Sequence, residues 1–315
     1  MAQALSFQER FGIKKETTWG TGVAPNVGFP ITDGSISLQQ TASYDEGRRG
    51  TPSGTFDALI DAGHSEVNIE GWYYPIAPTW LLYGLFGSDT ISGASDPYTH
   101  TLALATTIPS FTIEQDVLGG SNGGLRATGC RVGSMNFSFE AEKGALTYSA
   151  QLMGKIPSKV TATNPVITSE VAFEGWRATL TSTGLSCKAV SGEINLTREL
   201  QLVYTGCDSQ DVASINAGPM NIEGKFVVIF DDMAIFDLVL ANTRQVLTLT
   251  FTKGTPVREI KFTITDCFLN AQPFEFDYGQ MGVLGTIGFR GIYNATDAGV
   301  CKVAVKNSQS TSYAA

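Results

Sequence analysis

Apolar and polar residues alternate along many short segments of this chain, and a period of two is typical of half-buried β-strands. The alternating positions in the first half are Ile36 and Leu38, Val67 and Ile69, Met135, Phe137 and Phe139, and Leu146, Tyr148, Ala150 and Leu152. Those in the second half are Ile194 and Leu196, Met220 and Ile222, Phe274 and Phe276, and Val283, Ile287 and Phe289. Gly-rich segments separate them, so the pattern predicts a mainly β protein of antiparallel strands.

Three segments of the first half recur in the second half in the same order. The segment 68–87, which begins NIEG, matches 221–240 without a gap, and 130–154 matches 267–291. Upstream, DGSISL at 33–38 matches SGEINL at 191–196. Colinear matches separated by loops of different length indicate a tandem duplication.

Each half also contains one segment with the signals of a short helix. Pro78-Thr79 and Asp231-Asp232 are suited to a helix start, and apolar residues follow both. We therefore expect short amphipathic helices at 79–86 and 232–240. The resulting fold is two tandem β-sandwich or partial-barrel domains, each with one flanking α-helix, at 1–154 and 171–315, joined by a linker at 155–170.

Charge and composition argue against several classes of function. The net charge of −9 disfavours a nucleic-acid-binding surface, which needs clustered Lys and Arg. Five cysteines without C-x-x-C spacing suggest buried thiols in a reducing cytoplasm rather than disulfides or zinc ligands. His64 and His100 are too isolated for a catalytic or metal site, so we expect no enzyme and no cofactor. Neither a signal peptide nor a membrane span is visible.

Two stretches resemble tail tube proteins, also called major tail proteins, of long-tailed, siphovirus-like bacteriophages. They are FGIKKETTWGTGVAPNVGFPITDGSISL at 11–38 and YTHTLALATTIPSFTIEQD at 98–116. The likeness covers most of 7–154, and the internal repeat extends it to the second half.

This resemblance implies a structural virion protein whose rings stack into the hollow tube that conducts double-stranded DNA. Many members have one such domain and form rings of six, so two domains per chain imply three chains in a pseudo-sixfold ring. The implied partners are further copies of the chain, the tape measure protein and tail-end or baseplate proteins. DNA passes without specific binding, no membrane is involved, and the protein is made in the host cytoplasm and resides in the virion tail.

Two sets of residues are candidates for functional roles in a tube, one lining its lumen and the other joining its rings. Acidic residues on the polar faces of the strands would give an anionic lumen that repels phosphates, although they could equally solvate an outer face. These are Glu66, Glu70, Glu140, Glu193, Glu199, Glu223, Glu275 and Asp277. The long loops expected at 43–66 and 203–218, with the terminal arms 1–30 and 292–315, are candidates for contacts between rings. Their charged residues are Asp45, Glu46, Arg48, Arg49, Asp57, Asp208 and Asp211.

Two alternatives stay open at this point. A distal tail or baseplate hub protein could carry the same paired domains. A carbohydrate-binding β-sandwich could use Trp19, Trp72 and Trp176 as stacking platforms, although the position of Trp72 between a strand and an apolar helix favours core packing.

Overall fold

The computed structural model describes residues 9–117, 123–163, 165–168, 170–182, 189–206, 209–229, 237, 240, 243–271 and 284–315. Antiparallel strands dominate these residues, so the predicted mainly β class is confirmed. The helix predicted at 79–86 is present as α1 (Ala77–Phe86). Of the second predicted helix only residues 237 and 240 are described, both helical, and the rest of 232–240 lies outside the described residues.

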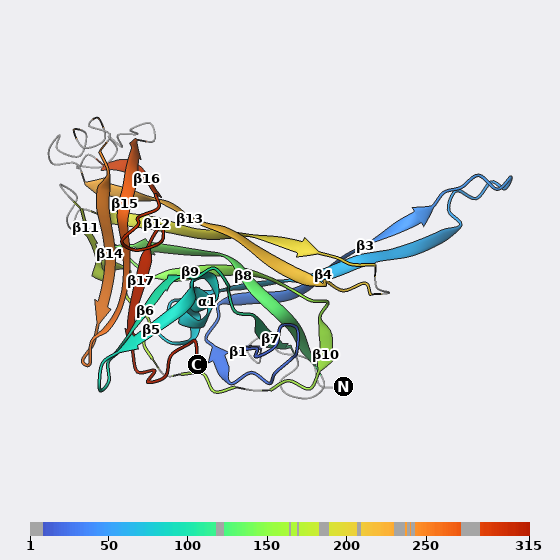
Figure 1. Cartoon of the computed structure of the whole chain (residues 1–315), viewed down its shortest axis with the longest axis horizontal. Helices are drawn as coiled ribbons and strands as arrows, with labels where there is room; N and C mark the ends of the chain where they lie inside the picture. The colour runs from blue at the N-terminus through green and yellow to red at the C-terminus, as the bar shows by residue number, and fades with distance from the viewer. Residues whose placement is uncertain are drawn as a thin grey trace.

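One antiparallel sheet runs through both halves of the chain (Figure 1). In order of pairing, its strands are β3 (Asp33–Asp45), β4 (Asp57–Trp72), β9 (Thr147–Gly154), β8 (Gly124–Glu140), β12 (Ala189–Val203), β13 (Ser214–Ile229), β16 (Leu284–Gly291), β15 (Arg258–Ala271), β14 (Gln245–Lys253) and β11 (Ala178–Thr181). We call it the main sheet. Its two halves join where β8 pairs with β12, and we call this pairing the β8–β12 seam.

Smaller groups of strands complete the fold. The first part of β8 also pairs with β10 (Ser158–Val160) and β7 (Phe111–Asp116), and β7 continues through β1 (Arg10–Lys15) to β2 (Val27–Phe29). On the other side of the molecule, β17 (Lys302–Asn307) joins β15 to β6 (Tyr98–Leu104), which pairs with β5 (Gly87–Ser92). A 3-10 turn, η2 (Gly175–Arg177), precedes β11.

The two halves repeat one strand order, β3-β4-β9-β8 and then β12-β13-β16-β15. The match of 33–38 with 191–196 agrees with the pairing registers, and that of 130–154 with 267–291 agrees over Cys267–Leu269. At Ala271 it is off by one residue, because β8 has a bulge between Val132 and Ser134. The NIEG match does not agree. Glu70 pairs with Ser149, whereas Thr286, the match of Ser149, pairs with Val227 and not with Glu223. The two NIEG segments therefore stand four residues apart along equivalent strands. An even displacement keeps every side chain on its face, so alternation alone did not reveal it. The duplication itself stays a prediction.

Hydrophobic packing links the halves as closely as the sheet does. The rings of Phe137 in β8 and Phe262 in β15 lie 5.0 Å apart between centroids, and those of Phe139 and Phe251 lie 5.3 Å apart. These residues belong to one buried cluster that extends from Phe11 to Tyr313. The domain boundaries proposed from sequence thus fall within a shared core, and they stay a prediction.

Helix α1 packs inside the molecule rather than on its flank. Pro78 occupies its first turn, where the missing N–H costs nothing, and Gly87 ends it with φ of 88°, a conformation that glycine tolerates best. Every residue except Trp80 is buried, so the expectation of an amphipathic surface helix was wrong. The apolar residues that suggested one face surround the whole helix.

Arg198, on β12, fixes this helix to the second half of the chain. Its buried guanidinium donates to the carbonyl oxygens of Leu85 (3.1 Å), Ala105 (3.0 Å) and Gly218 (2.9 Å). Burial lowers the pKa of Arg198 below its ordinary value. A cation at the carboxyl end of a helix is stabilising, because the last carbonyl groups have no partner within the helix.

We expect Arg198→Met to lower the free energy of unfolding by about 2 kcal/mol or more, because one buried and two partly buried carbonyl groups would lose a charged donor. Chemical denaturation of the purified chain measures this. Arg244→Met is the control, since Arg244 is well exposed and its substitution should change stability by less than about 0.5 kcal/mol. Equal stability of the two variants would contradict the role assigned to Arg198.

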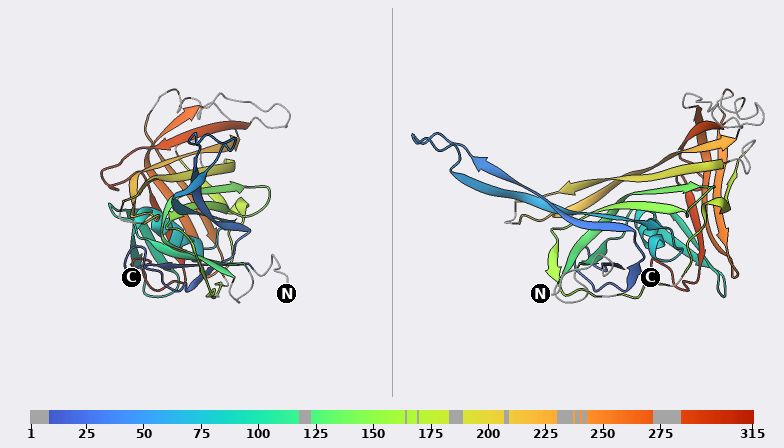
Figure 2. Two further views of the ribbon diagram at one scale, coloured as in Figure 1. Left: turned by 90° about the vertical axis from the view of Figure 1, so that its right-hand side faces the viewer. Right: turned by 180° about the vertical axis from the view of Figure 1, so that it is seen from behind.

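The segments expected to be long loops are partly strands. Strand β3 continues to Asp45 and β4 begins at Asp57, so the expected loop 43–66 shrinks to 46–56. Likewise β12 ends at Val203 and β13 begins at Ser214. Both faces of the ends of β3 and β4 meet solvent, so no apolar alternation marks them in the sequence. The β3–β4 hairpin projects far from the body in Figure 1 and in the right view of Figure 2.

The described parts of the terminal arms are packed into the fold. Phe11 and Ile13 of β1 are fully buried. At the other end, β17 lies between β15 and β6, and buried Tyr313 shares a hydrogen bond with Asn307 (2.8 Å). The described residues of both arms are thus held in the fold, and a role of the arms in assembly stays a prediction.

Candidate assembly surfaces

One face of the main sheet is polar across both halves of the chain. The pairing registers place a continuous row of side chains across six strands: Glu70, Ser149, Asn136, Asn195, Glu223 and Arg290. Parallel rows contain Asn68, Gln151, Ser134 and Thr197, and Thr147, Ser138, Glu193 and Lys225. The opposite side chains of the same strands, such as Val67, Phe137 and Ile194, are buried in the core. We call this surface the polar face.

The polar face gathers most of the acidic residues predicted to line a lumen. Those on it are Glu66, Glu70, Glu140, Glu193 and Glu223. Glu199 is exposed at a bulge of β12, while Glu275 and Asp277 lie outside the described residues. Sequence reasoning missed Asp33, which pairs with Glu70 and extends the row. The signal that could have found Asp33 is its place at the start of the strand that pairs with the strand of Glu70.

The face is negatively charged, because its six carboxylates outnumber its basic groups. The basic residues in the same rows are Arg131, Lys225 and Arg290. Lys225 lies 3.4 Å from Glu193. Burial raises the pKa of Glu193, but hydrogen bonds from Asn136, Asn195 and Lys225 outweigh it and hold that pKa below its ordinary value. This carboxylate is therefore ionised at neutral pH.

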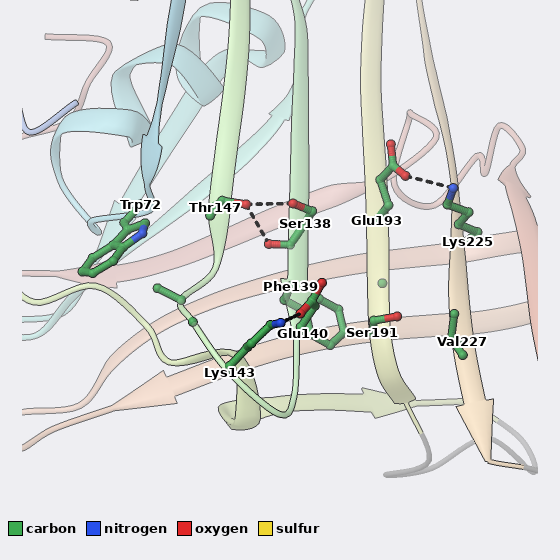
Figure 3. A pocket seen from close by; sticks show the side chains of 13 residues that line it. Trp72, Ser138, Phe139, Glu140, Lys143, Thr147, Ser191, Glu193, Lys225 and Val227 are labelled. Carbon is green, nitrogen blue, oxygen red and sulfur yellow. Dashed lines mark hydrogen bonds and ion pairs between the residues drawn. The ribbon is translucent and has the colours of Figure 1, made fainter. Parts of the chain in front are cut away.

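The polar face is hollowed around Trp72, at the end of β4 (Figure 3). A cavity of about 590 Å³ is lined by Trp72, Glu140, Lys143, Glu193 and Lys225 among others. A second hollow of about 320 Å³ also involves Trp72, with Ser138 and Thr147. The Trp72 side chain is 49% exposed, so its expected packing in the core was wrong. Its position in β4 places it on the outer side of the sheet, next to Thr147.

The second candidate surface is the tip of the projecting hairpin, residues 46–56 with the ends of β3 and β4. Arg49 forms an ion pair with Asp45 and lies over the ring of Phe56 at 4.7 Å. Asp45 and Asp57 face each other as the last strand pair, and Glu46 and Arg48 are exposed beyond it. The tip is thus a compact, charged structure.

Large apolar side chains near this tip are left in solvent. Tyr44 and Leu59 are both 65% exposed, and Ile60 is 61% exposed. An isolated two-stranded hairpin is marginally stable in water, and exposed apolar residues favour contact with another surface.

Asp211, which the sequence also predicted to contact a neighbouring ring, has partners in its own chain. Asp211 lies 3.2 Å from Lys155 and accepts a hydrogen bond from the backbone of Ile156 (2.9 Å). Gln210 beside it accepts a hydrogen bond from Gly63 at 2.9 Å through its backbone, which holds the β12–β13 hairpin against β4. Asp208 lies outside the described residues.

His100 and the three described cysteines, the side chains best suited to acid–base or thiol chemistry, are buried in the fold. His100 is fully buried, with Asp89 at 3.0 Å and the carbonyl of Gln309 at 2.9 Å. Burial raises the pKa of the Cys267 thiol to about 11, and it also raises those of Cys130 and Cys301. In the described part of the chain, no three His, Cys, Asp or Glu side chains form a group able to hold a metal ion. The described helices also include none with the length and apolar character needed to span a membrane.

Glu16 connects the two stretches that carry the family resemblance. Its buried carboxylate accepts hydrogen bonds from the backbone of Gly20 and Gly129, both at 2.8 Å. The hydroxyls of Ser110 (2.8 Å) and Thr112 (2.9 Å) also donate to it. ETTWGTG at 16–22 and PSFT at 109–112 therefore meet at one carboxylate. Gly129 has φ of 64°, which suits glycine at this bend of β8.

We expect Glu16→Gln to reduce the free energy of unfolding by about 1–3 kcal/mol, since an amide has one acceptor oxygen in place of two. Thermal unfolding of the purified chain measures the loss. Glu142→Gln, at an exposed position in the β8–β9 turn, serves as the control. A Glu16→Gln protein as stable as the control would show that the four hydrogen bonds contribute little.

Comparison with known proteins agrees with the motifs that meet at Glu16. A comparison with curated proteins gave no match. A family model described as phage tail tube protein matches residues 6–291, which span both halves of the main sheet. Members of this family are structural and not enzymatic, in agreement with the absence of catalytic residues expected from the sequence. The chain belongs to the phage tail tube protein family.

Proposed function

We propose that three copies of this chain form a ring, that rings stack into a tail tube, and that the polar face lines the lumen. The observation that carries this proposal is the continuity of the polar face across the β8–β12 seam. A tube wall built of such faces would present charged and hydrogen-bonding side chains in both halves of each chain and across the seam between them.

The ring of three follows from the repeated strand order. If β3-β4-β9-β8 and β12-β13-β16-β15 each act as one unit of the wall, three chains supply six similar units. Rings with closed rotational symmetry require a heterologous interface between neighbours.

Symmetry analysis of the assembled protein tests this number. We expect electron microscopy of purified recombinant protein to show tubes of uniform width with threefold averaged symmetry and a weaker sixfold repeat. Six chains in each ring would contradict the proposal, and so would a protein that stays monomeric at high concentration.

The lumen proposed here acts on DNA by repulsion. Carboxylates on the polar face outnumber its basic residues, and the remaining side chains are mainly Ser, Thr, Asn and Gln. Phosphates are repelled by such a surface, so double-stranded DNA slides without being held. The protein would be made in the host cytoplasm and then become part of the virion tail.

The projecting hairpin is the proposed contact between rings. Its exposed Tyr44, Leu59 and Ile60 favour burial against a neighbouring copy along the tube axis. A tube also needs a tape measure protein inside during assembly and tail-end or baseplate proteins at its ends, which are the further partners proposed. The family match does not favour the alternatives of a hub or a carbohydrate-binding protein.

A further inference from the structure

The base of the projecting hairpin is held by residues from the second half of the chain. Strand β4 pairs with β9 from Ser65 to Trp72, and β9 ends opposite Ser65. Beyond that point the backbone of β4 bonds to Gln210. The Gln210 carbonyl oxygen accepts a hydrogen bond from the backbone N–H of Gly63 at 2.9 Å, and its side-chain amide donates to the carbonyl oxygen of Ile60 at 3.2 Å. The second half of the chain therefore supports the hairpin where it leaves the main sheet.

Tyr204 adds a third contact between the β12–β13 hairpin and β4. Its hydroxyl lies 3.1 Å from Nδ1 of His64. The backbone N–H of Ala213 donates to the carbonyl oxygen of Val203 at 2.9 Å, so the two sides of the β12–β13 hairpin are joined at this end. We call Tyr204 together with residues 209–213 the brace.

Asp211 anchors the brace to the body of the molecule. Its carboxylate accepts hydrogen bonds from the backbone N–H groups of Ile156 (2.9 Å) and Val212 (3.0 Å) and lies 3.2 Å from the ammonium of Lys155. Burial raises the pKa of Tyr204, and the negative charge of Asp211 raises it further, as expected of a carboxylate near a phenol. Hydrogen bonds to ionised groups are stronger than neutral ones, so Asp211 contributes more to holding the brace than its neutral contacts do.

Lys155 in turn is fixed by the cluster around Glu16. Its ammonium lies over the Trp19 ring, 5.5 Å from the centroid. Its side chain also packs closely on Gly20 and Gly129, where an added Cβ would approach a Lys155 carbon to 2.9 Å and 3.3 Å, respectively. Both glycines donate backbone hydrogen bonds to Glu16. A continuous series of contacts thus runs from the buried Glu16 carboxylate to the base of the projecting hairpin.

We propose that the brace sets the direction of the projecting hairpin for ring stacking, and that Asp211 is the positioning residue that holds the brace in place. The inference rests on the proposed function and names the residue that prepares its stacking contact. A two-stranded hairpin is marginally stable by itself, and the tip lies far from the body, so a small rotation at the base displaces the tip widely (Figure 1). The tip makes the contact between rings, whereas Asp211 acts on it from within its own chain.

Hydrogen exchange of the unassembled full chain tests the anchor. The amide of Gly63 exchanges when the brace opens, because its hydrogen is bonded to the brace. We expect Asp211→Ala to speed this exchange about tenfold or more, and Asp211→Asn, which keeps an oxygen for the Ile156 N–H, to have a smaller effect. Glu259→Ala in β15 is the matched control, since this partly buried carboxylate lies 3.1 Å from Lys306. Equal Gly63 exchange in Asp211→Ala and the control would contradict the anchoring role.

Tube formation tests the positioning role. Only chains with the hairpin in place can stack, so a smaller fraction of such chains lowers the apparent affinity between rings. We expect Asp211→Ala to form single rings like wild type but to need about threefold or more higher concentration for tubes, as followed by light scattering and negative-stain microscopy. Glu259→Ala should form tubes at the wild-type concentration. Faster Gly63 exchange in Asp211→Ala together with tubes at the wild-type concentration would overturn the positioning role, whereas a wild-type protein that forms neither rings nor tubes would overturn the proposed function.

Discussion

Replacing residues 46–56 by a short Gly-Ser turn should leave a folded chain that makes no tubes. The tip of the hairpin lies beyond the last strand pair, Asp45 and Asp57, and has no part in the buried core. Shortening a surface loop changes the free energy of unfolding little, on the order of 1 kcal/mol. Stacking would fail because the variant lacks the charged tip, which the ion pair of Arg49 with Asp45 and the Phe56 contact shape, and the exposed Tyr44, Leu59 and Ile60 alone should not hold two rings together.

Negative-stain microscopy and thermal unfolding together measure this result. A matched control replaces residues 254–257, the exposed turn between β14 and β15, by Gly-Ser, and this variant should form tubes of normal length. Single rings from the 46–56 variant would fit the proposal, since ring closure uses a different surface. Normal tubes from that variant would mean that the stacking contact lies elsewhere.

Side-chain alternation predicted the strands with a buried face and also the common side of Glu66, Glu70, Glu140, Glu193 and Glu223. It did so because a period of two separates core from solvent in any half-buried strand. The start of α1 was equally readable, since Pro78 and Thr79 are local signals.

Other features depend on contacts that no local pattern contains. The ends of β3 and β4 are solvated on both faces, so they resembled a loop. The NIEG repeat preserved the faces while misplacing the register by four residues, because only pairing with β9 and β16 defines it. The side chains of Gln115 and Arg198 form hydrogen bonds with backbone groups that are far away in the sequence, and no pattern in the residues around them predicts these bonds.

Reversing the charge of the polar face should turn a passive wall into one that holds DNA. The triple variant Glu66→Lys, Glu70→Lys and Glu223→Lys changes three positions in β4 and β13 that share this face. The Glu66 carboxylate accepts a hydrogen bond from the exposed Gln39 side chain at 3.0 Å, and the fold should tolerate the loss of this surface contact. Glu70 and Glu223 are exposed, and surface substitutions usually change stability by less than about 0.5 kcal/mol each.

Sedimentation of assembled tubes with short DNA duplexes measures the change. Wild-type tubes should leave the duplex in solution, whereas the Lys variant should carry it into the pellet at low salt. If each ring offers six or more phosphate contacts, its affinity should fall by about 10³-fold or more between ~50 mM and ~200 mM salt, because counterions are released on binding. The corresponding Gln variant is the control: it removes repulsion without adding attraction and should bind weakly at every salt concentration. Lys-variant tubes that leave DNA in solution at low salt would contradict the proposal that DNA meets the polar face in the assembled tube.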